Sequence, residues 1–282
     1  MKSKLNTFVI LALWFILAVI PVYFSYDYLT TPLHERPYHD DYEWMKPSGI
    51  LSHGLGILGS LLMIIGVTTY SSRKRIKVFH NTGRLSNWLL FHIFLCTLGP
   101  YYVTLHTTFI VKGIVSISYW SMMIVVASGV FGRYLYNRIP KTSNGVFTSV
   151  YEIERDIKAL RTTLSSYIEE HALKLADFPQ IEQISTALFF SIKWRFSRKK
   201  ILSICTTSIK PNLQNSDRSK ILGKLNKFIQ LQVNLSLRKP FQTYFNYWHI
   251  FHLPLAALMF IIMFFHIGVA IVFGYTWIFS TN

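Results

Sequence analysis

Apolar residues in this chain gather in five long stretches, each long enough to cross a lipid bilayer. A membrane-spanning helix needs about 20 mostly apolar residues, because the hydrocarbon core is about 30 Å thick. The five stretches cover Leu5–Phe24, Ile50–Tyr70, Asn87–Val111, Gly113–Tyr136 and about Trp248–Phe279. The pattern therefore predicts an all-α fold, an integral membrane helical bundle with five transmembrane helices.

The first stretch has two interpretations. A basic start followed by an apolar run is typical of a secretory signal peptide as well as of a membrane anchor. The residues Pro-Val-Tyr-Phe-Ser-Tyr-Asp at 21–27 offer no cleavage site of the small-x-small type. We therefore interpret the stretch as an anchor.

One sizeable polar region, residues 137–240, separates the fourth stretch from the fifth. Ser149 and Glu152 have the spacing of a capping box, and an amphipathic pattern follows them. We expect helices over Val150–Ala176, Ile181–Thr206 and Ser219–Leu237, with Pro179, Pro211 and Pro240 between or after them. The chain thus divides into a membrane part at 1–136, a basic helical insertion at 137–240 and a second membrane part at 241–282.

Charge is scarce but strongly unbalanced. Charged residues make up 15% of the chain, yet 29 Lys and Arg against 13 Asp and Glu give a formal net charge of +16. A hydrophobic content of 51% excludes a disordered chain. Nucleic-acid binding would account for the positive charge but not for the hydrophobicity, so we expect no nucleic-acid partner.

The distribution of charge predicts an orientation. The loop 25–48 holds five acids and two bases, whereas 71–88 holds five bases and no acid, and 133–239 holds 19 bases and 8 acids. Cytoplasmic loops are enriched in Lys and Arg. We therefore expect a cytoplasmic N-terminus, a cytoplasmic insertion at 137–240, an outer acidic loop and an outer C-terminus. A bacterial inner membrane is the expected location.

Four histidines within the apolar stretches form a regular pattern. His92 and His106 are fourteen residues apart in the third stretch, and His252 and His266 are fourteen apart in the fifth. Fourteen residues of helix return to within about 40° of the same face, about 21 Å further along the axis. Since both helices run from inside to outside in the predicted topology, His92 should lie at the depth of His252 and His106 at that of His266.

This pattern favours two haems. Haem iron accepts two axial imidazoles, one on each side of the macrocycle. We therefore expect two b-type haems, an inner one held by His92 and His252 and an outer one held by His106 and His266. Gly99, midway along the third stretch, would let a macrocycle or a neighbouring helix approach closely.

Other metal centres are disfavoured. Zinc ligands usually lie one helical turn apart or on convergent loops, and a fourteen-residue repeat is too long for that. The two cysteines, Cys96 and Cys205, form no C-x-x-C-H motif, which excludes covalent c-type haem in this chain.

The segments Leu89-Leu90-Phe91-His92 with Leu105-His106-Thr107, and Trp248 to Pro254 with Phe265-His266-Ile267, resemble those of membrane diheme b-type cytochromes. The spacing is similar to that of the respiratory cytochrome b bundle and of the ferric-reductase-like transmembrane family. The resemblance covers the second to fifth stretches at the level of motifs, and it implies electron transfer across the membrane. Unlike those families, the chain has a loop of about 100 residues between its haem helices. That loop contains no G-x-G-x-x-G motif, so we expect no reductase domain within it.

Further residues are candidates for contacts with the haems. Cations suit haem propionates, and Arg84 and Arg133 are candidates at the inner face, with Lys112 or Arg36 at the outer face. His53 has several interpretations: a quinone contact, a propionate contact, an extra ligand or plain packing. His249 lies one turn before His252 and competes with it, although its spacing to His266 does not match the other pair.

The leading hypothesis is a diheme cytochrome subunit of an oxidoreductase complex rather than a complete enzyme. It would pass electrons between a partner protein or the quinone pool and an acceptor at the other face. The expected partners are membrane lipid, other redox subunits (a cytochrome, iron–sulfur protein or flavoprotein) and quinone. A His-based proton relay or transporter without haem, and a structural membrane anchor, are the alternatives.

Overall fold

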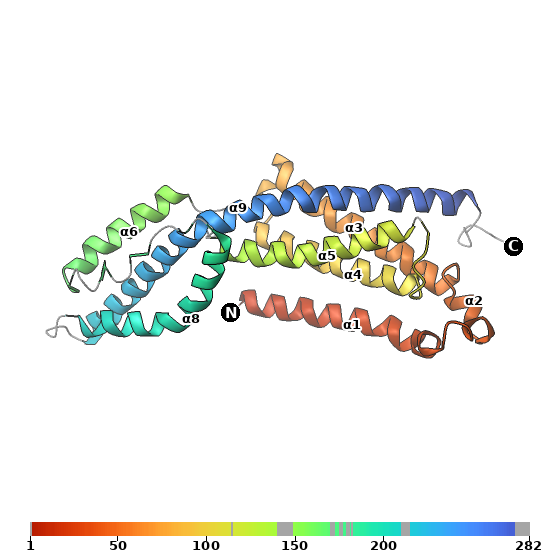
Figure 1. The fold of residues 1–282 in the computed structure, drawn as a ribbon, viewed down its shortest axis with the longest axis horizontal. Coiled ribbons are helices and arrows are strands. Elements are labelled where there is room, and N and C mark those ends of the chain that lie inside the picture. Colours follow the sequence, from red (N-terminus) through yellow and green to blue (C-terminus); the bar gives the residue numbers. More distant parts are fainter. Residues whose placement is uncertain are drawn as a thin grey trace. The chain divides into compact units, whose positions relative to one another are not determined.

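A computed structural model of the chain describes residues 2–113, 115–139, 149–169, 173–174, 177–178, 181, 183–209 and 215–273. In these ranges all regular secondary structure is helical, apart from one isolated β-bridge between Ile168 and Ile209. The α-helices are α1 (Lys2–Thr30), α2 (Tyr42–Met45), α3 (Ile50–Arg75), α4 (Leu85–His106), α5 (Val115–Arg138), α6 (Val150–Ser165), α8 (Ile184–Thr207) and α9 (Asn215–Val272) (Figure 1).

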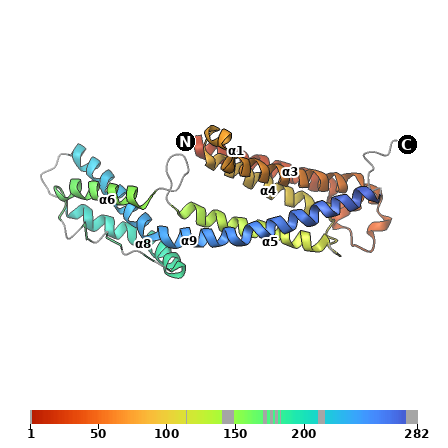
Figure 2. The ribbon, with the colours of Figure 1, turned by 90° about the horizontal axis from the view of Figure 1, so that it is seen from above.

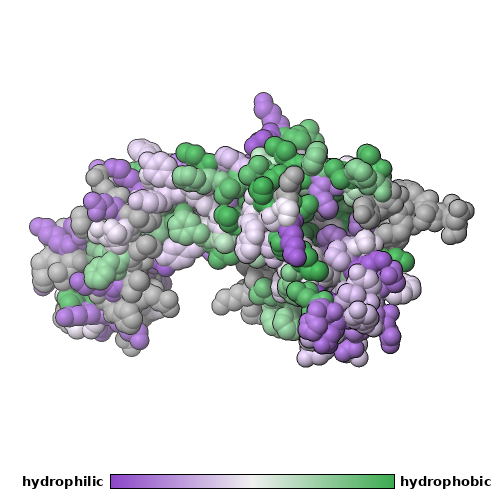
Figure 3. Space-filling model, turned by 45° about the vertical axis from the view of Figure 1, so that its right-hand side comes forward, coloured by the Kyte–Doolittle hydropathy of each residue, from purple (hydrophilic) through white to green (hydrophobic). Residues whose placement is uncertain are grey.

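The predicted all-helical membrane architecture is confirmed at this level. Five helical segments are long and apolar enough to cross a membrane: Phe8–Thr30, Tyr42–Arg75, Leu85–His106, Val115–Arg138 and Asp217–Val272. Each contains most of one predicted stretch. Large apolar side chains such as Phe15 and Phe251 are mostly exposed, as expected for helices whose surroundings are lipid. Hydrophobic side chains are abundant on the visible face of the molecule (Figure 3).

The chain forms two compact units, and their boundaries lie inside helices. The first unit comprises residues 1–129 and 251–282, and the second comprises 130–250. The separate helix predicted at Ser219–Leu237 and the fifth span are in fact one helix, α9, which continues through Pro240. A proline inside a helix costs about 3 kcal/mol. Here Pro240 and Phe241 are fully buried, and their packing offsets that cost.

In the first unit, α3 and α4 run side by side in close contact (Figure 2). Gly59 and Gly99 face each other: a Cβ atom at Gly59 would lie 2.6 Å from the carbonyl oxygen of Gly99, and one at Gly99 would lie 2.7 Å from that of Gly59. The contact thus requires glycine on both helices. Without a hydrophobic driving force between helices in lipid, such close approach is a main source of association.

The other helices of this unit are joined by hydrogen bonds to backbone carbonyls. Tyr101 and Tyr102 of α4 donate their hydroxyls to Ala18 and Leu17 of α1, at 2.8 and 3.0 Å. Ser118 of α5 donates to the Met259 carbonyl of α9 at 3.1 Å. Each bond satisfies a hydroxyl that lipid cannot solvate.

A methionine cluster forms the core of the first unit. Met63 of α3, Met122 of α5 and Met259 and Met263 of α9 are all less than 10% exposed and contact one another. Methionine is flexible and adapts to irregular gaps between helices. Three helices therefore meet at one apolar layer, and Val103 of α4 packs against it.

The second unit has an apolar core of its own, made by α6, α8 and the first half of α9. Leu164, Cys205, Leu225 and Phe228 are fully buried in it, and burial raises the pKa of the Cys205 thiol. The predicted capping box is confirmed: Ser149 Oγ accepts from the Glu152 amide, and the Glu152 carboxylate accepts from the Ser149 amide, both at 3.1 Å. The helix that it starts ends at Ser165, earlier than the predicted Ala176.

The glycine contact between α3 and α4 makes a testable prediction. In Gly59→Ala the added methyl meets backbone that has no room to move, which should destabilise the protein by roughly 1–3 kcal/mol. The higher helix propensity of alanine, worth about 1 kcal/mol, offsets part of this loss. Unfolding in detergent, followed by circular dichroism, measures this. The matched control is Gly54→Ala on the same helix, whose Cβ would meet open space. Equal stability of the two variants would contradict the proposed contact.

Candidate functional site

His106 is the last residue of α4, and α3 holds its ring in place. The Nδ1 atom of His106 lies 2.9 Å from the carbonyl oxygen of Ser52. A carbonyl only accepts, so Nδ1 carries the proton and Nε2 keeps its lone pair. A Cβ atom at Gly56 would lie 2.8 Å from the ring, so glycine makes room for this imidazole.

Three imidazoles gather at this level of the first unit. The rings of His53 and His106 are 5.9 Å apart between centroids, in an edge-to-face arrangement. His266 of α9 lies within electrostatic range of both. The two residues of the predicted outer pair, His106 and His266, thus lie within electrostatic range of each other, and His53 of α3 lies beside His106.

His92 is held by α3 in the same manner, about two turns from Gly99 along α4. Its Nδ1 lies 3.0 Å from the Gly66 carbonyl oxygen, which again leaves Nε2 as the atom with the lone pair. The Tyr70 ring lies against the imidazole, with 5.3 Å between centroids, and the Cys96 sulfur is 3.5 Å from Nδ1.

His252 is held by α5 instead. Its Nδ1 lies 2.7 Å from Ser128 Oγ, and Ser128 Oγ also lies 2.9 Å from the Val125 carbonyl oxygen. The Ser128 hydroxyl can accept from Nδ1 or donate to it, so the contact orients the His252 ring in either tautomer. His92 and His106 therefore share one state, a tethered Nδ1–H and an Nε2 lone pair, and His252 shares with them a tether at Nδ1.

The other histidine and glycine candidates have structural contacts. His249 belongs to the second unit, where Nδ1 bonds the Phe245 carbonyl oxygen at 3.1 Å and the ring packs on Trp248. Gly99 faces Gly59 of α3. Close approach of a neighbouring helix, rather than of a macrocycle, is one of the two alternatives predicted for this glycine.

The cation candidates lie in different settings. Arg84 is exposed and is the N-cap residue of α4. Arg133 belongs to the second unit, with its guanidinium 5.7 Å from the Tyr136 ring centroid. Lys112 is exposed in the segment between α4 and α5.

Sequence reasoning did not identify Arg73. Its Nη2 donates to the Gly83 carbonyl at 3.1 Å, but its Nε is buried and has no hydrogen-bond partner in the described part of the chain. Arg73 lies seven residues after Gly66 on α3, and so on the face that holds His92. The sequence contains that spacing, but nothing in the run of basic residues at the end of the helix distinguishes Arg73 from its neighbours.

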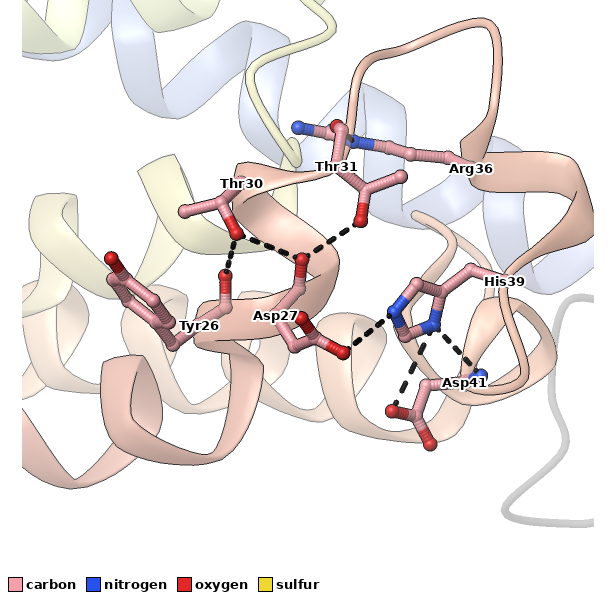
Figure 4. A network of polar contacts seen from close by, with 7 residues as sticks. All are labelled: Tyr26, Asp27, Thr30, Thr31, Arg36, His39 and Asp41. Carbon is pink, nitrogen blue, oxygen red and sulfur yellow. Dashed lines mark hydrogen bonds and ion pairs between the residues drawn. The ribbon is translucent and has the colours of Figure 1, made fainter.

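Arg36 fixes the backbone directly after His106. It is 6% exposed, and its guanidinium donates to the carbonyls of Thr31, Thr108 and Leu29 at 3.0, 2.7 and 2.9 Å. Thr108 and Phe109 have φ of 46° and 64°, so α4 ends at His106 instead of continuing to the predicted Val111. The Arg36 guanidinium is therefore occupied by hydrogen bonds to backbone carbonyls. Next to it, Asp27, His39 and Asp41 form further polar contacts of the same loop (Figure 4).

The donor set suits two-sided ligation better than a compact metal site. Among the described residues, no group of three or more His, Cys, Asp or Glu is placed to hold a metal ion. Axial ligation of haem instead needs single imidazoles with oriented Nε2 atoms. The orphaned Arg73 Nε is a donor that fits a carboxylate such as a haem propionate.

Comparisons of the chain with protein-family models, with curated proteins and with solved structures found no match.

Arg36→Gln should open the loop that follows α1. The substitution removes charged donors from buried carbonyls, which should cost about 2 kcal/mol or more. Limited proteolysis within residues 31–49 and thermal unfolding would both report the change. The control is Lys46→Gln. It also removes one positive charge from this loop, but the ion-pair partner of Lys46 is the exposed carboxylate of Glu43. If the two variants resist proteolysis equally, Arg36 does not hold the loop.

Proposed function

We propose that the chain is a diheme b-type cytochrome subunit that transfers electrons across a membrane. The observation that supports this most strongly is the shared tether of His92, His106 and His252, each with Nδ1 in hydrogen-bond contact with a neighbouring helix. Together with the fourteen-residue spacing on α4 and α9, this arrangement suits axial ligands. His92 with His252, and His106 with His266, are the proposed pairs.

When bound, the haems would supply one-electron redox chemistry. The histidine tethers contribute orientation: an Nδ1–H bonded to a carbonyl makes Nε2 more basic and stops the ring from turning. Arg73 offers a guanidinium to a propionate from the face of α3 that holds His92. His53 lies beside His106 and is a neighbour of the second proposed pair.

The methionine cluster would keep water out of the middle of the bundle. Met259 lies midway between His252 and His266 in the sequence, and it is 4% exposed. A dry, apolar surrounding disfavours the more highly charged state of a redox centre and so tunes its potential. The chain itself thus contributes ligands, spacing and a low dielectric, and electrons would come from a redox partner or quinone.

A proton relay is the second candidate, and the cluster of His53, His106 and His266 favours it. Ionisable groups inside a membrane protein are costly and are frequently functional. The optical spectrum of the protein distinguishes the two proposals, because imidazoles alone do not absorb visible light.

The decisive experiment is a reduced-minus-oxidised spectrum of the purified chain, with haem content from a pyridine haemochrome assay. We expect two haems per chain. His106→Ala and His266→Ala should each remove the same haem, and His92→Ala and His252→Ala the other. His80→Gln, at an exposed position, is the control. The absence of haem bands would refute the proposal, and loss of neither haem in the variants would refute the pairing.

Ser128→Ala tests the tether of His252 alone. Without the Ser128 hydroxyl the imidazole loses the contact that orients it, so the reduction potential of one haem should shift by an amount on the order of tens of millivolts. Redox titration monitored by absorbance measures the shift. Ser116→Ala, in the first turn of the same helix, should leave both potentials unchanged. Identical potentials in Ser128→Ala and the parent protein would argue against a role for His252 as a ligand.

A further inference from the structure

A polar cleft in the second unit has no part in the proposed haem chemistry. Its volume is about 280 Å³, and it lies between the start of α6 and one face of α9. The apolar residues Val150 of α6 and Leu235 of α9 line it, and α9 also contributes Arg238, Lys239, Gln242, Thr243 and Asn246. Two cations and three uncharged polar side chains thus surround one small space, and none of the lining residues is acidic.

Arg238 carries the strongest sign of a missing ligand. Its Nε atom is buried and has no hydrogen-bond partner among the residues that the structure describes. A buried donor without an acceptor is costly, and the cost is larger for a charged group. The planar guanidinium matches the oxygens of a phosphate group, to which it donates two parallel hydrogen bonds.

The start of α6 adds to the positive potential of the cleft. Val150 is the first residue of this 16-residue helix, and the N-terminus of a helix carries partial positive charge. Glu152, in the first turn of the same helix, binds the Ser149 amide through its carboxylate and opposes part of that charge. The positive charge of the cleft itself comes from Arg238 and Lys239, which favour an anion.

The surroundings of the cleft are those of a membrane–water interface. Tyr244 and Tyr247 of α9 are exposed beside it, and their rings are in contact. The Arg138 guanidinium of α5 lies 5.1 Å from the Tyr134 ring centroid and 6.0 Å from that of Phe241. The long apolar part of α9 begins directly afterwards, at about Trp248. Tyrosines and cations concentrate at the depth of lipid headgroups, just before such a stretch.

We propose that this cleft binds the phosphate group of an anionic phospholipid. Arg238 holds the phosphate oxygens, Lys239 adds positive charge, and Gln242, Thr243 and Asn246 are placed to donate hydrogen bonds to the headgroup. The acyl chains would lie along the apolar continuation of α9. A free phosphate has the same oxygens, so the experiment must separate the two sources.

The test is native mass spectrometry of the delipidated full-length protein in detergent, after titration with phosphatidylglycerol, with phosphatidylcholine or with inorganic phosphate. We expect one phosphatidylglycerol retained at low concentration. Arg238→Gln should weaken its binding about tenfold, the effect of losing a charge-assisted hydrogen bond. Arg238→Lys should weaken it less. Lys224→Gln, which removes a charge from an exposed position on the same helix, should have no effect.

Each outcome decides the proposal. Circular dichroism checks that Arg238→Gln is folded, and Lys239→Gln, at an exposed position, provides a second variant if it is not. Retention of phosphatidylcholine as tight as that of phosphatidylglycerol would overturn the proposal. So would equal losses in Arg238→Gln and Lys224→Gln, which would indicate diffuse charge attraction. If inorganic phosphate binds and phosphatidylglycerol does not, the site takes a soluble anion and the lipid assignment is wrong.

Discussion

The contact between α3 and α4 at Gly59 and Gly99 determines most of what the first unit can do. These helices approach so closely that backbone lies on backbone. At that distance the carbonyl oxygens of α3 come within reach of side chains on α4, and two of them, those of Ser52 and Gly66, accept a hydrogen bond from a histidine. Wider packing would separate both imidazoles from their acceptors. The glycines therefore position histidines that lie a turn or more away from them.

Lipid explains why the histidines depend on a neighbouring helix. Most hydroxyls in the spans bond within their own helix: Thr68, Thr97 and Thr104 each donate to a carbonyl four residues earlier. The imidazoles of His92 and His106 instead contact carbonyls of α3, whereas that of His249 contacts the Phe245 carbonyl of its own helix. Hydrocarbon offers no acceptor, so a polar ring that faces it needs one from the protein. Tethering and burial thus arise from the same requirement.

The sequence was sufficient for the five helices long and apolar enough to cross a membrane and for the capping box at Ser149, because both depend on neighbouring residues in the chain. It was misleading at Pro240, where a local signal for a helix end was overridden by tertiary packing around Phe241. It also overestimated the length of α4, because the helix ends through the bond from Arg36, 72 residues earlier, to Thr108. The sequence did not identify Arg73 for a related reason. In a run of three basic residues, only packing reveals which one is buried.

The tethers also bear on the choice between ligand and proton carrier. An imidazole that relays protons takes up a proton at one nitrogen and releases it from the other, so both partners must be able to exchange protons. A backbone carbonyl accepts a hydrogen bond but does not take the proton. With Nδ1 of His92 and of His106 bonded to carbonyls of α3, only Nε2 is left to react. A ring with one fixed nitrogen and one available lone pair is poorly suited to proton relay, which supports the proposed role as an axial ligand.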